Sequence, residues 1–233
     1  MQVAYLKDSQ TDVYRVPAFE QFEWLEHGFG TARSGAWPDP ARLSMVKQVH
    51  SAIVVAADAA GAGWIGEGDA LVASKPGALV GVRTADCVPV LLVDACRRAV
   101  AAVHAGWKGT SAEIVKCTIS EMMVRFGTVP GDVWAAIGPA IGVCCYEVGP
   151  EVAGRFGRWF PELDGIDRHV KIDLTEVNRR QLVEAGVPAT QAFTGAPCTA
   201  CTPTLDSFRR DREAAGRMIA AIGVRAGGVR AGV

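Results

Sequence analysis

Residues 78–110 read ALVGVRTADCVPVLLVDACRRAVAAVHAGWKGT, and this stretch decides the fold. It contains three short, nearly continuous apolar runs, at Ala78–Val82, Val88–Val93 and Ala99–Val103. Runs of this length between polar or turn residues are typical of strands that are buried on both faces. Pro89 has no N–H to give to a sheet, so it favours an edge, a strand start or a bulge for the second run.

Apolar runs outside this stretch predict further strands. Gln48–Val55 and Val133–Ile137 are both short and apolar, whereas Arg217–Val224 fits a strand or a helix equally well. The first forty residues are dense in Gly, Pro and Asp, which indicates short strands and turns.

Helical periods follow in the second half of the chain. Ser111–Phe126 has its apolar residues on one stripe, with Gly127 as a stop. Pro150–Phe160 predicts a helix entered by proline, and Asp173 or Thr175 can cap another that runs to Ala185. Strands and helices mix without strict alternation, which indicates an α+β or mixed-sheet α/β protein.

Length and composition limit the class of protein. The 233 residues carry 24 Lys and Arg against 25 Asp and Glu, so the formal charge of −1 gives no sign of nucleic-acid binding. No apolar run approaches the ~18–20 residues that span a bilayer, and the first residues lack the regions of a secretory signal. We expect a soluble, cytoplasmic, single-domain protein over residues 1–233, with a flexible Gly/Ala/Arg-rich tail from about 225.

Three segments hold residues that can carry chemistry: KQVH ending at His50, TADCVP around Cys87, and VHAGWKGT around His104. Each lies at or near the end of a predicted strand, so all three side chains can project from one rim of a sheet. One thiolate and two imidazoles suit Zn²⁺, with a fourth position left open for catalysis. Spacings of 37 and 17 residues match no structural zinc pattern. A Cys87–His104 nucleophile–base pair, or ordinary packed residues, are the alternatives that the residues leave open.

Other polar positions are candidates for binding an anion or a metal. Lys108 lies in a Gly-rich turn before a predicted helix, and Arg33 lies in the Gly-rich early loop. The basic cluster Arg209–Arg212 is more typical of solvated surface charge. Cys198 and Cys201 form a C-x-x-C, for which two reduced thiols in a loop is the expected state, with a redox or metal role as the alternative. Cys144 and Cys145 begin a stretch that we expect to be a loop lining some site.

Several motifs occur in one order along the chain: HGFGTARSG, KQVHS, GDALV, GVRTADCVPVLLVD, AAVHAGWKGT, AAIGPAIGVCCYEVGPEV and CT…SFRRDR…GRMIAAIGV. Together they resemble a bacterial family once described as multicopper polyphenol oxidases or laccase-domain proteins, and now as purine nucleoside phosphorylases of the YfiH type. The resemblance covers almost the whole chain. It implies a single α+β domain of mixed β-sheets flanked by helices, with the last apolar run a strand.

The resemblance also implies a site and an activity. It maps the family's metal ligands onto His50, Cys87 and His104, with zinc bound there. It implies phosphorolysis of adenosine, inosine and methylthioadenosine, and deamination of adenosine, so purine nucleoside and phosphate are the expected partners of a monomer or weak homodimer. We add Arg33, Gln48, Lys108 and Asp86 as candidate substrate or phosphate contacts, Asp86 being alternatively a proton donor or a partner of a ligand imidazole.

The sequence departs from the family pattern in two places, and a second activity is also considered. The stretch between HGFGTARSG and KQVH is short and lacks a Ser-Leu-Asn element, and SFRRDR replaces the more usual aromatic pair before the arginines. The rival is a copper-dependent polyphenol oxidase. True laccase chemistry needs several copper ions held by many histidines, which four histidines cannot supply.

Overall fold

The structure is a computed structural model that describes residues 5–58, 61–161 and 168–227. Within these residues the strands form two large sheets and one small sheet. The seven-stranded sheet has the order β1-β2-β3-β15-β8-β4-β6 and the six-stranded sheet the order β14-β11-β9-β10-β7-β5, while β12 pairs with β13. Both large sheets mix parallel and antiparallel pairs.

The strands of the seven-stranded sheet are β1 (Leu6–Lys7), β2 (Tyr14–Arg15), β3 (Leu25–Phe29), β15 (Met218–Val224), β8 (Leu79–Thr84), β4 (Leu43–Lys47) and β6 (Gly63–Glu67). Those of the six-stranded sheet are β14 (Ala192–Phe193), β11 (Val133–Ile137), β9 (Val88–Asp94), β10 (Ala99–Ala105), β7 (Ala70–Ala73) and β5 (Val54–Ala56). The small sheet pairs β12 (Glu147–Val148) with β13 (Val170–Lys171). The α-helices are α1 (Trp107–Ser111), α2 (Ile114–Phe126), α3 (Pro150–Ala153), α4 (Leu174–Glu184) and α5 (Phe208–Asp211).

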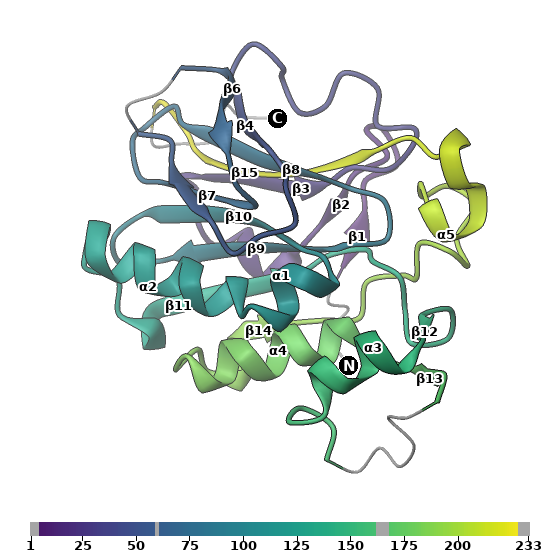
Figure 1. Ribbon diagram of the computed structural model, residues 1–233. Helices are drawn as coiled ribbons and strands as arrows, with labels where there is room; N and C mark the ends of the chain where they lie inside the picture. The colour runs from purple at the N-terminus through teal and green to yellow at the C-terminus, as the bar shows by residue number, and fades with distance from the viewer. Residues whose placement is uncertain (1–4, 59–60, 162–167, 228–233) are drawn as a thin grey trace.

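The six-stranded sheet is the middle layer (Figure 1), with α2 and α4 on one face and the seven-stranded sheet on the other. Alternate residues of β9 show this arrangement directly. Val90 and Leu92 pack in the same cluster as the apolar side chains of α2, whereas Leu91 and Val93 pack with residues of β8 and β15. The continuous apolar runs of β9 and β10 therefore reflect strands with two buried faces, as the sequence predicts.

Pro89 occupies the start of a central strand. It is the second residue of β9, in register with His104 of β10, and β9 lies between β10 and β11. The strand-start interpretation is therefore correct, and the edge interpretation is wrong.

Two predicted elements differ from the structure. Of the strand expected at Gln48–Val55 only the end is present, as the start of β5, because β4 ends at Lys47 and residues 48–53 form a loop. The carboxylate of Asp69 accepts hydrogen bonds from successive N–H groups in this loop and so takes the place of a strand partner. The helix expected at Pro150–Phe160 is shorter, because α3 ends at Ala153 and a 3₁₀ turn over Gly154–Phe156 follows. The glycine at 154 weakens a continuous helix there.

The other predicted elements are present with shifted ends. The helix expected at Ser111–Phe126 is divided into α1 and α2 by Glu113, which has a left-handed conformation, and it ends at Gly127 as expected. Asp173 rather than Thr175 caps α4, since its side chain accepts the N–H of Glu176. The last apolar run is the strand β15. The fold is α+β with mixed sheets, and α2 and α4 cover the outer face of the six-stranded sheet.

The end of the chain is anchored as far as it is described. Arg225, where the tail was expected to begin, donates its N–H to the carbonyl of Trp24 and its Nε to that of Leu25. Residues 228–233 lie outside the described residues. Among the helices that the structure describes, none is long and apolar enough to cross a membrane.

Candidate metal and active site

His50, Cys87 and His104 come together at one point. Each offers one ligand atom, and these atoms all lie within 4.8 Å of one another. His50 comes from the loop between β4 and β5, Cys87 from the link that carries the chain from β8 in one large sheet to β9 in the other, and His104 from the end of β10. The two imidazole rings are 5.0 Å apart between centroids and nearly perpendicular.

Asp69 holds the two histidines in place. Its fully buried carboxylate lies 2.9 Å from Nδ1 of His104, and its Oδ1 also accepts the N–H of His50 at 3.0 Å. The Nδ1 contact leaves Nε2 of His104 free to face the site, the arrangement in which a carboxylate orients a metal-binding imidazole.

The same carboxylate shapes the loop that carries His50. It accepts N–H groups from Val49 and Ser51 and the Ser51 hydroxyl as well. His50 has a φ of 58°, a left-handed conformation in which His is enriched among residues other than glycine. These bonds hold the backbone of His50 in that conformation.

Charge distribution in the site favours a thiolate. Burial alone raises the pKa of the Cys87 thiol, but hydrogen bonds from His104 and His50 and their charge lower this pKa to about 6. Burial lowers the pKa of His104, but the contacts with Asp69 and Cys87 raise it to about 9. These contacts therefore favour a Cys87 thiolate beside a His104 imidazolium in the metal-free protein.

We expect the alkylation rate of Cys87 in chelator-treated protein to rise around pH 6 and level off near neutral pH. The reason is that only the thiolate reacts, and the lowered pKa exposes it early. Peptide mass spectrometry after timed iodoacetamide treatment measures this rate, and zinc reloading should protect Cys87. A rate that rises only above pH 8 would contradict a Cys87 pKa lowered by His104 and His50.

Gly106 leaves room for a ligand at the centre of the group. A Cβ at this position would lie 3.0 Å from Sγ of Cys87 and 3.2 Å from Cδ2 of His50. Any larger residue would therefore crowd both side chains, which accounts for a glycine here at the start of α1.

The donor set fits zinc. One thiolate and two imidazoles are ligand types that Zn²⁺ prefers, and three protein ligands leave the fourth position of a tetrahedral ion open. A buried carboxylate fixes one imidazole from behind, and a glycine keeps the near side free of side-chain atoms. The group therefore fits a catalytic rather than a structural zinc site.

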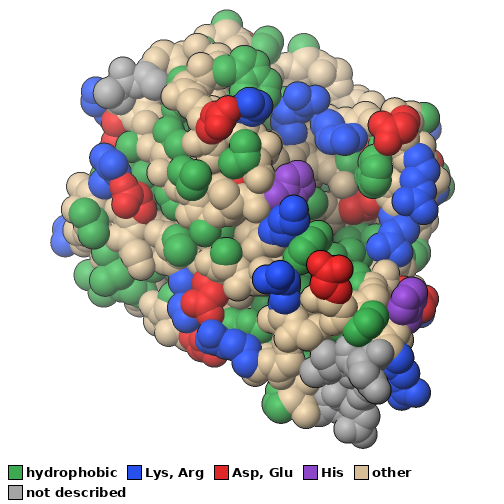
Figure 2. Space-filling view, in the orientation of Figure 1, with side chains coloured by type: hydrophobic (Ala, Val, Ile, Leu, Met, Phe, Trp, Pro, Cys, Tyr) green, Lys and Arg blue, Asp and Glu red, His purple; other side chains and the backbone are tan. Residues whose placement is uncertain are grey.

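A pocket of about 580 Å³ opens over this group. Its walls combine apolar and cationic side chains; the lining residues are Val46, Lys47, Gln48, His50, Trp64, Arg83, Ala85, Asp86, Cys87, His104, Ile141, Tyr146, Phe208, Arg209 and Arg217. In Figure 2, Lys and Arg side chains gather around a histidine near the middle of the face shown. The volume lies within the range that small-molecule sites occupy.

Two of the four candidate substrate contacts line the pocket, and both are bonded to the protein. The side-chain amide of Gln48 donates to the carbonyl of Arg83 and accepts its N–H, both at 2.8 Å, so Gln48 continues the pairing of β4 with β8. The carboxylate of Asp86 accepts the Thr199 hydroxyl and the N–H of Arg209, both at 2.6 Å. Asp86 thus fixes neighbouring loops, whereas the partner of the ligand imidazole is Asp69.

The other two candidates are not among the residues that line the pocket. Arg33 is exposed in the loop after β3, and Lys108 lies over the ring of Trp107 on α1. Arg209, from the cluster expected to be solvated surface charge, does line the pocket.

Several residues of the pocket and the ligand group are not evident in the sequence. Asp69, Trp64, Arg83 and Phe208 carry no signal as single residues, and Gly106 stands out only as part of the Gly-rich turn before α1. Asp69 was visible only as the acidic residue of the GDALV motif, directly before the strand β7. The signal that could have identified it is an Asp directly before a continuous apolar strand, where its carboxylate would be buried and would need partners such as the histidines.

Comparison with known proteins shows which family the chain belongs to. A family model described as multi-copper polyphenol oxidoreductase laccase matches residues 31–225. A purine nucleoside phosphorylase from Clostridium acetobutylicum is 39% identical over 189 residues, which cover 80% of this chain and 78% of that protein. The chain belongs to the YfiH/YlmD family of purine nucleoside phosphorylases.

Further members of the YfiH/YlmD family extend the comparison. The crystal structure of YlmD from Geobacillus stearothermophilus superposes with a TM-score of 0.86 at 27% identity, covering 96% of this chain and all of that one. A protein named adenosine deaminase, from an unidentified prokaryote, is 42% identical over 142 residues, which cover 58% of this chain and 54% of that protein. The family and the fold that the sequence motifs indicate are thus confirmed.

Proposed function

We propose that this protein is a zinc-dependent purine nucleoside enzyme that catalyses phosphorolysis of adenosine, inosine and methylthioadenosine and hydrolytic deamination of adenosine. The observation that carries the proposal is the His50–Cys87–His104 group, whose three donor atoms lie within 4.8 Å on the wall of the pocket. The relatives named purine nucleoside phosphorylase and adenosine deaminase support the two reactions.

The two reactions make different demands on the site. Phosphorolysis breaks the bond between C1′ of the ribose and the purine nitrogen, forms a bond from C1′ to a phosphate oxygen, and gives the purine a proton. Deamination replaces the amino group at C6 by an oxygen from water and releases ammonia. Both need the purine ring to be held firmly and charge to be stabilised beside it.

The side chains that line the pocket can meet both demands. Trp64, Tyr146 and Phe208 offer aromatic faces on which a purine can stack. Lys47, Arg83, Arg209 and Arg217 supply positive charge for a phosphate. When bound by His50, Cys87 and His104, zinc supplies a Lewis acid in a fixed position. Asp69 keeps the imidazole of His104 oriented throughout.

Arg83 is the cation best placed to meet a phosphate. Its exposed side chain lines the pocket, and within the described residues its guanidinium has no hydrogen-bond or ion-pair partner, whereas Lys47 pairs with Glu67 at 2.7 Å. Arg209 donates to the carbonyls of Cys145 and Glu147.

We expect Arg83→Gln to raise the KM for phosphate roughly tenfold, since a charge-assisted hydrogen bond is worth about 1.5–3 kcal/mol. Deamination, which consumes no phosphate, should change less than twofold. Steady-state kinetics with varied phosphate measure both effects, and Arg125→Gln on the distant helix α2 is the matched control. An unchanged phosphate KM would remove Arg83 from the phosphate site.

The proposed function is tested by substrate profiling of purified protein. We expect adenine release from adenosine that requires phosphate, inosine formation that does not, and loss of both on chelation with recovery on adding zinc. If zinc-loaded wild-type protein produces neither adenine nor inosine, the proposal fails.

A metal-free cysteine hydrolase is the second candidate because of one observation. Cys87, His104 and Asp69 form a chain of nucleophile, base and orienting carboxylate. His50 has no role in that chain, yet its donor atom lies in the same group. Activity that survives full metal removal would favour the hydrolase.

A copper polyphenol oxidase lacks the residues that it needs. His27 is buried and its Nε2 accepts the N–H of Val16, and exposed His169 lies beside Glu147. Only two of the four histidines therefore face the pocket. Oxygen uptake with a phenol after copper loading would be the result that revives this activity.

Purine nucleoside and phosphate are the proposed partners of a monomer or weak homodimer made of one domain. Its seven cysteines are all free, which supports a reducing, cytoplasmic location.

A further inference from the structure

Four cysteines that the proposed activity does not use come together beside the pocket. Cys144 and Cys145 lie in the loop between β11 and β12, and Cys198 and Cys201 lie in the loop between β14 and α5. Their sulfur atoms all lie within 4.8 Å of one another. We propose that these residues, the tetrathiolate cluster, form a second metal site that holds a structural Zn²⁺.

The sulfur positions fit a tetrahedral ion. Sγ of Cys201 lies 3.6 Å from Sγ of Cys144 and 3.3 Å from Sγ of Cys145. Four sulfurs at the usual Zn–S distance of about 2.3 Å would be about 3.8 Å apart at the corners of a tetrahedron. Since all six sulfur–sulfur distances are at most 4.8 Å, shifts of about 1 Å or less suffice to enclose the ion. Two thiols from each of two loops also give a closed site with no open position, which is typical of structural zinc.

The backbone around the cluster is arranged to stabilise a thiolate. The N–H of Gly142 donates to Sγ of Cys198 at 3.1 Å. A Cβ at position 142 would lie 3.3 Å from Sγ of Cys144 and 3.2 Å from Cβ of Cys198, so a side chain there would crowd the cluster. The two loops are joined next to the sulfurs by a parallel bridge between Ala140 and Cys198.

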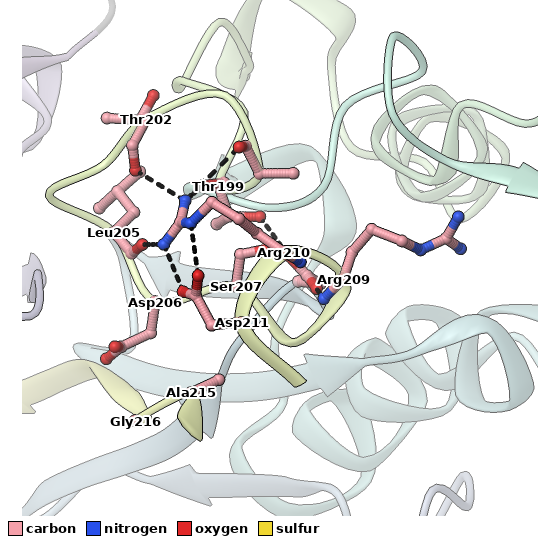
Figure 3. Close-up of polar contacts among 12 residues, drawn as sticks. Thr199, Thr202, Leu205, Asp206, Ser207, Arg209, Arg210, Asp211, Ala215 and Gly216 are labelled. Atoms are coloured by element: carbon pink, nitrogen blue, oxygen red, sulfur yellow. Dashed lines mark hydrogen bonds and ion pairs between the residues drawn. The ribbon is translucent and has the colours of Figure 1, made fainter. Parts of the chain in front are cut away.

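Positive charge lies beside the cluster, which matters because four thiolates around Zn²⁺ leave a net charge of −2. Arg209 donates to the carbonyl of Cys145 at 3.4 Å. The charge of Arg210 is already offset by Asp211, whose carboxylate lies 2.6 Å from its guanidinium, so Arg210 acts on the cluster through the backbone. It donates to the carbonyl of Thr199 at 2.9 Å, to that of Thr202 at 3.3 Å and to that of Leu205 at 2.7 Å. Figure 3 shows the Arg210 guanidinium at the centre of the 199–205 loop. The two arginines thus bind the chain on both sides of the cluster.

A disulfide explains less of this arrangement. It would join two of the four sulfurs at about 2.05 Å and leave the other two thiols without a role. It would also need an oxidant to accept two electrons and two protons. A metal ion uses all four sulfurs and needs no redox partner.

The cluster connects to the active site through one residue. Thr199, which lies between Cys198 and Cys201, donates its hydroxyl to Asp86, and Asp86 also accepts the N–H of Arg209. Asp86 directly precedes Cys87. The ion would therefore fix the loops that position Asp86 and the pocket residues Tyr146 and Arg209. Its removal should lower the melting temperature and raise the KM for nucleoside more than it changes kcat.

Metal content tests the proposal directly. We expect inductively coupled plasma mass spectrometry to find two zinc ions per chain in the wild type, and one in each of Cys201→Ser, Cys144→Ser and Cys87→Ala. Cys117→Ser, which changes an exposed cysteine of α2 outside both groups, is the matched control and should keep two. The Cys87→Ala protein loaded with Co²⁺ should show the absorption of a tetrahedral tetrathiolate.

Two results would overturn the proposal of a second zinc site. One zinc ion per chain in both wild type and Cys201→Ser would overturn the proposal. A wild-type protein lighter by two hydrogens, with a disulfide among the four cysteines, would overturn it as well. If the serine variants do not fold, the wild type alone decides, because titration with a mercurial thiol reagent should release two zinc ions per chain. These readouts do not depend on nucleoside activity, so they separate failure of the second site from failure of the proposed function.

Discussion

Cys87→Ala is expected to abolish both proposed reactions, with a fall in kcat/KM on the order of a thousandfold or more. The change removes the one thiolate from a three-ligand site, and the two remaining imidazoles hold zinc weakly. The protein should stay folded, because Cys87 lies in the link between β8 and β9 and not in a packed strand. His104→Ala should have the same effect on activity.

Three measurements check this prediction together: metal content, phosphate-dependent adenine release, and circular dichroism with thermal melting. Cys96→Ala is the matched control, since Cys96 is free, exposed and outside both cysteine groups. Full activity in metal-depleted Cys87→Ala protein would refute the role of the thiolate. Loss of cooperative melting in both variants would indicate a structural role instead.

Asp69→Asn is expected to have the second largest effect, with zinc affinity reduced about 10- to 100-fold. The amide keeps the size of the side chain but removes the negative charge that faces His104 Nδ1 and three backbone N–H groups of the 49–51 loop. One of the two accepting oxygens becomes an NH2 group that cannot accept, so the 49–51 loop loses part of the hydrogen bonds that hold His50 in its left-handed conformation. Competition with a zinc-binding dye measures the affinity, and an unchanged value would show that Asp69 does not support the metal ligands.

Acid should reproduce part of this effect in the metal-free protein. Burial raises the pKa of Asp69, but the hydrogen bonds from His104 and Ser51 lower it to about 2, below the usual value of 3.8. A lowered pKa in the folded state means that the stabilisation is fully present above about pH 4 and is lost as the pH falls towards 2. Urea unfolding of wild type and Asp69→Asn should therefore differ most near neutral pH and converge at low pH.

Local patterns predicted the centre of the fold and left its edges uncertain. The continuous apolar runs of β9 and β10 indicated two buried faces, and the structure supplies both, with helices on one side and the second sheet on the other. No local pattern could show that β8 and β9 belong to different sheets, because pairing depends on distant partners. The strand expected over residues 48–53 is absent for the same reason, since the conformation of this loop depends on Asp69, which lies between β6 and β7.

Some residues of the candidate site could likewise be predicted from the sequence, and others could not. His50, Cys87 and His104 stand out because histidine is scarce in this chain and each follows or ends a strand. Asp69, Gly106 and Arg83 become visible only when the chain is folded, because their roles are to orient, to leave space and to lie near a pocket. The four clustered cysteines were seen as two separate pairs, and only the folded chain brings Cys144 and Cys145 beside Cys198 and Cys201.

Anomalous X-ray scattering above and below the zinc absorption edge, from crystals of protein purified without chelator, tests the catalytic ion most directly. The account predicts a zinc peak within about 2.0–2.3 Å of Nε2 of His104, Sγ of Cys87 and a ring nitrogen of His50. An active protein whose crystals show no zinc between these three side chains would contradict it.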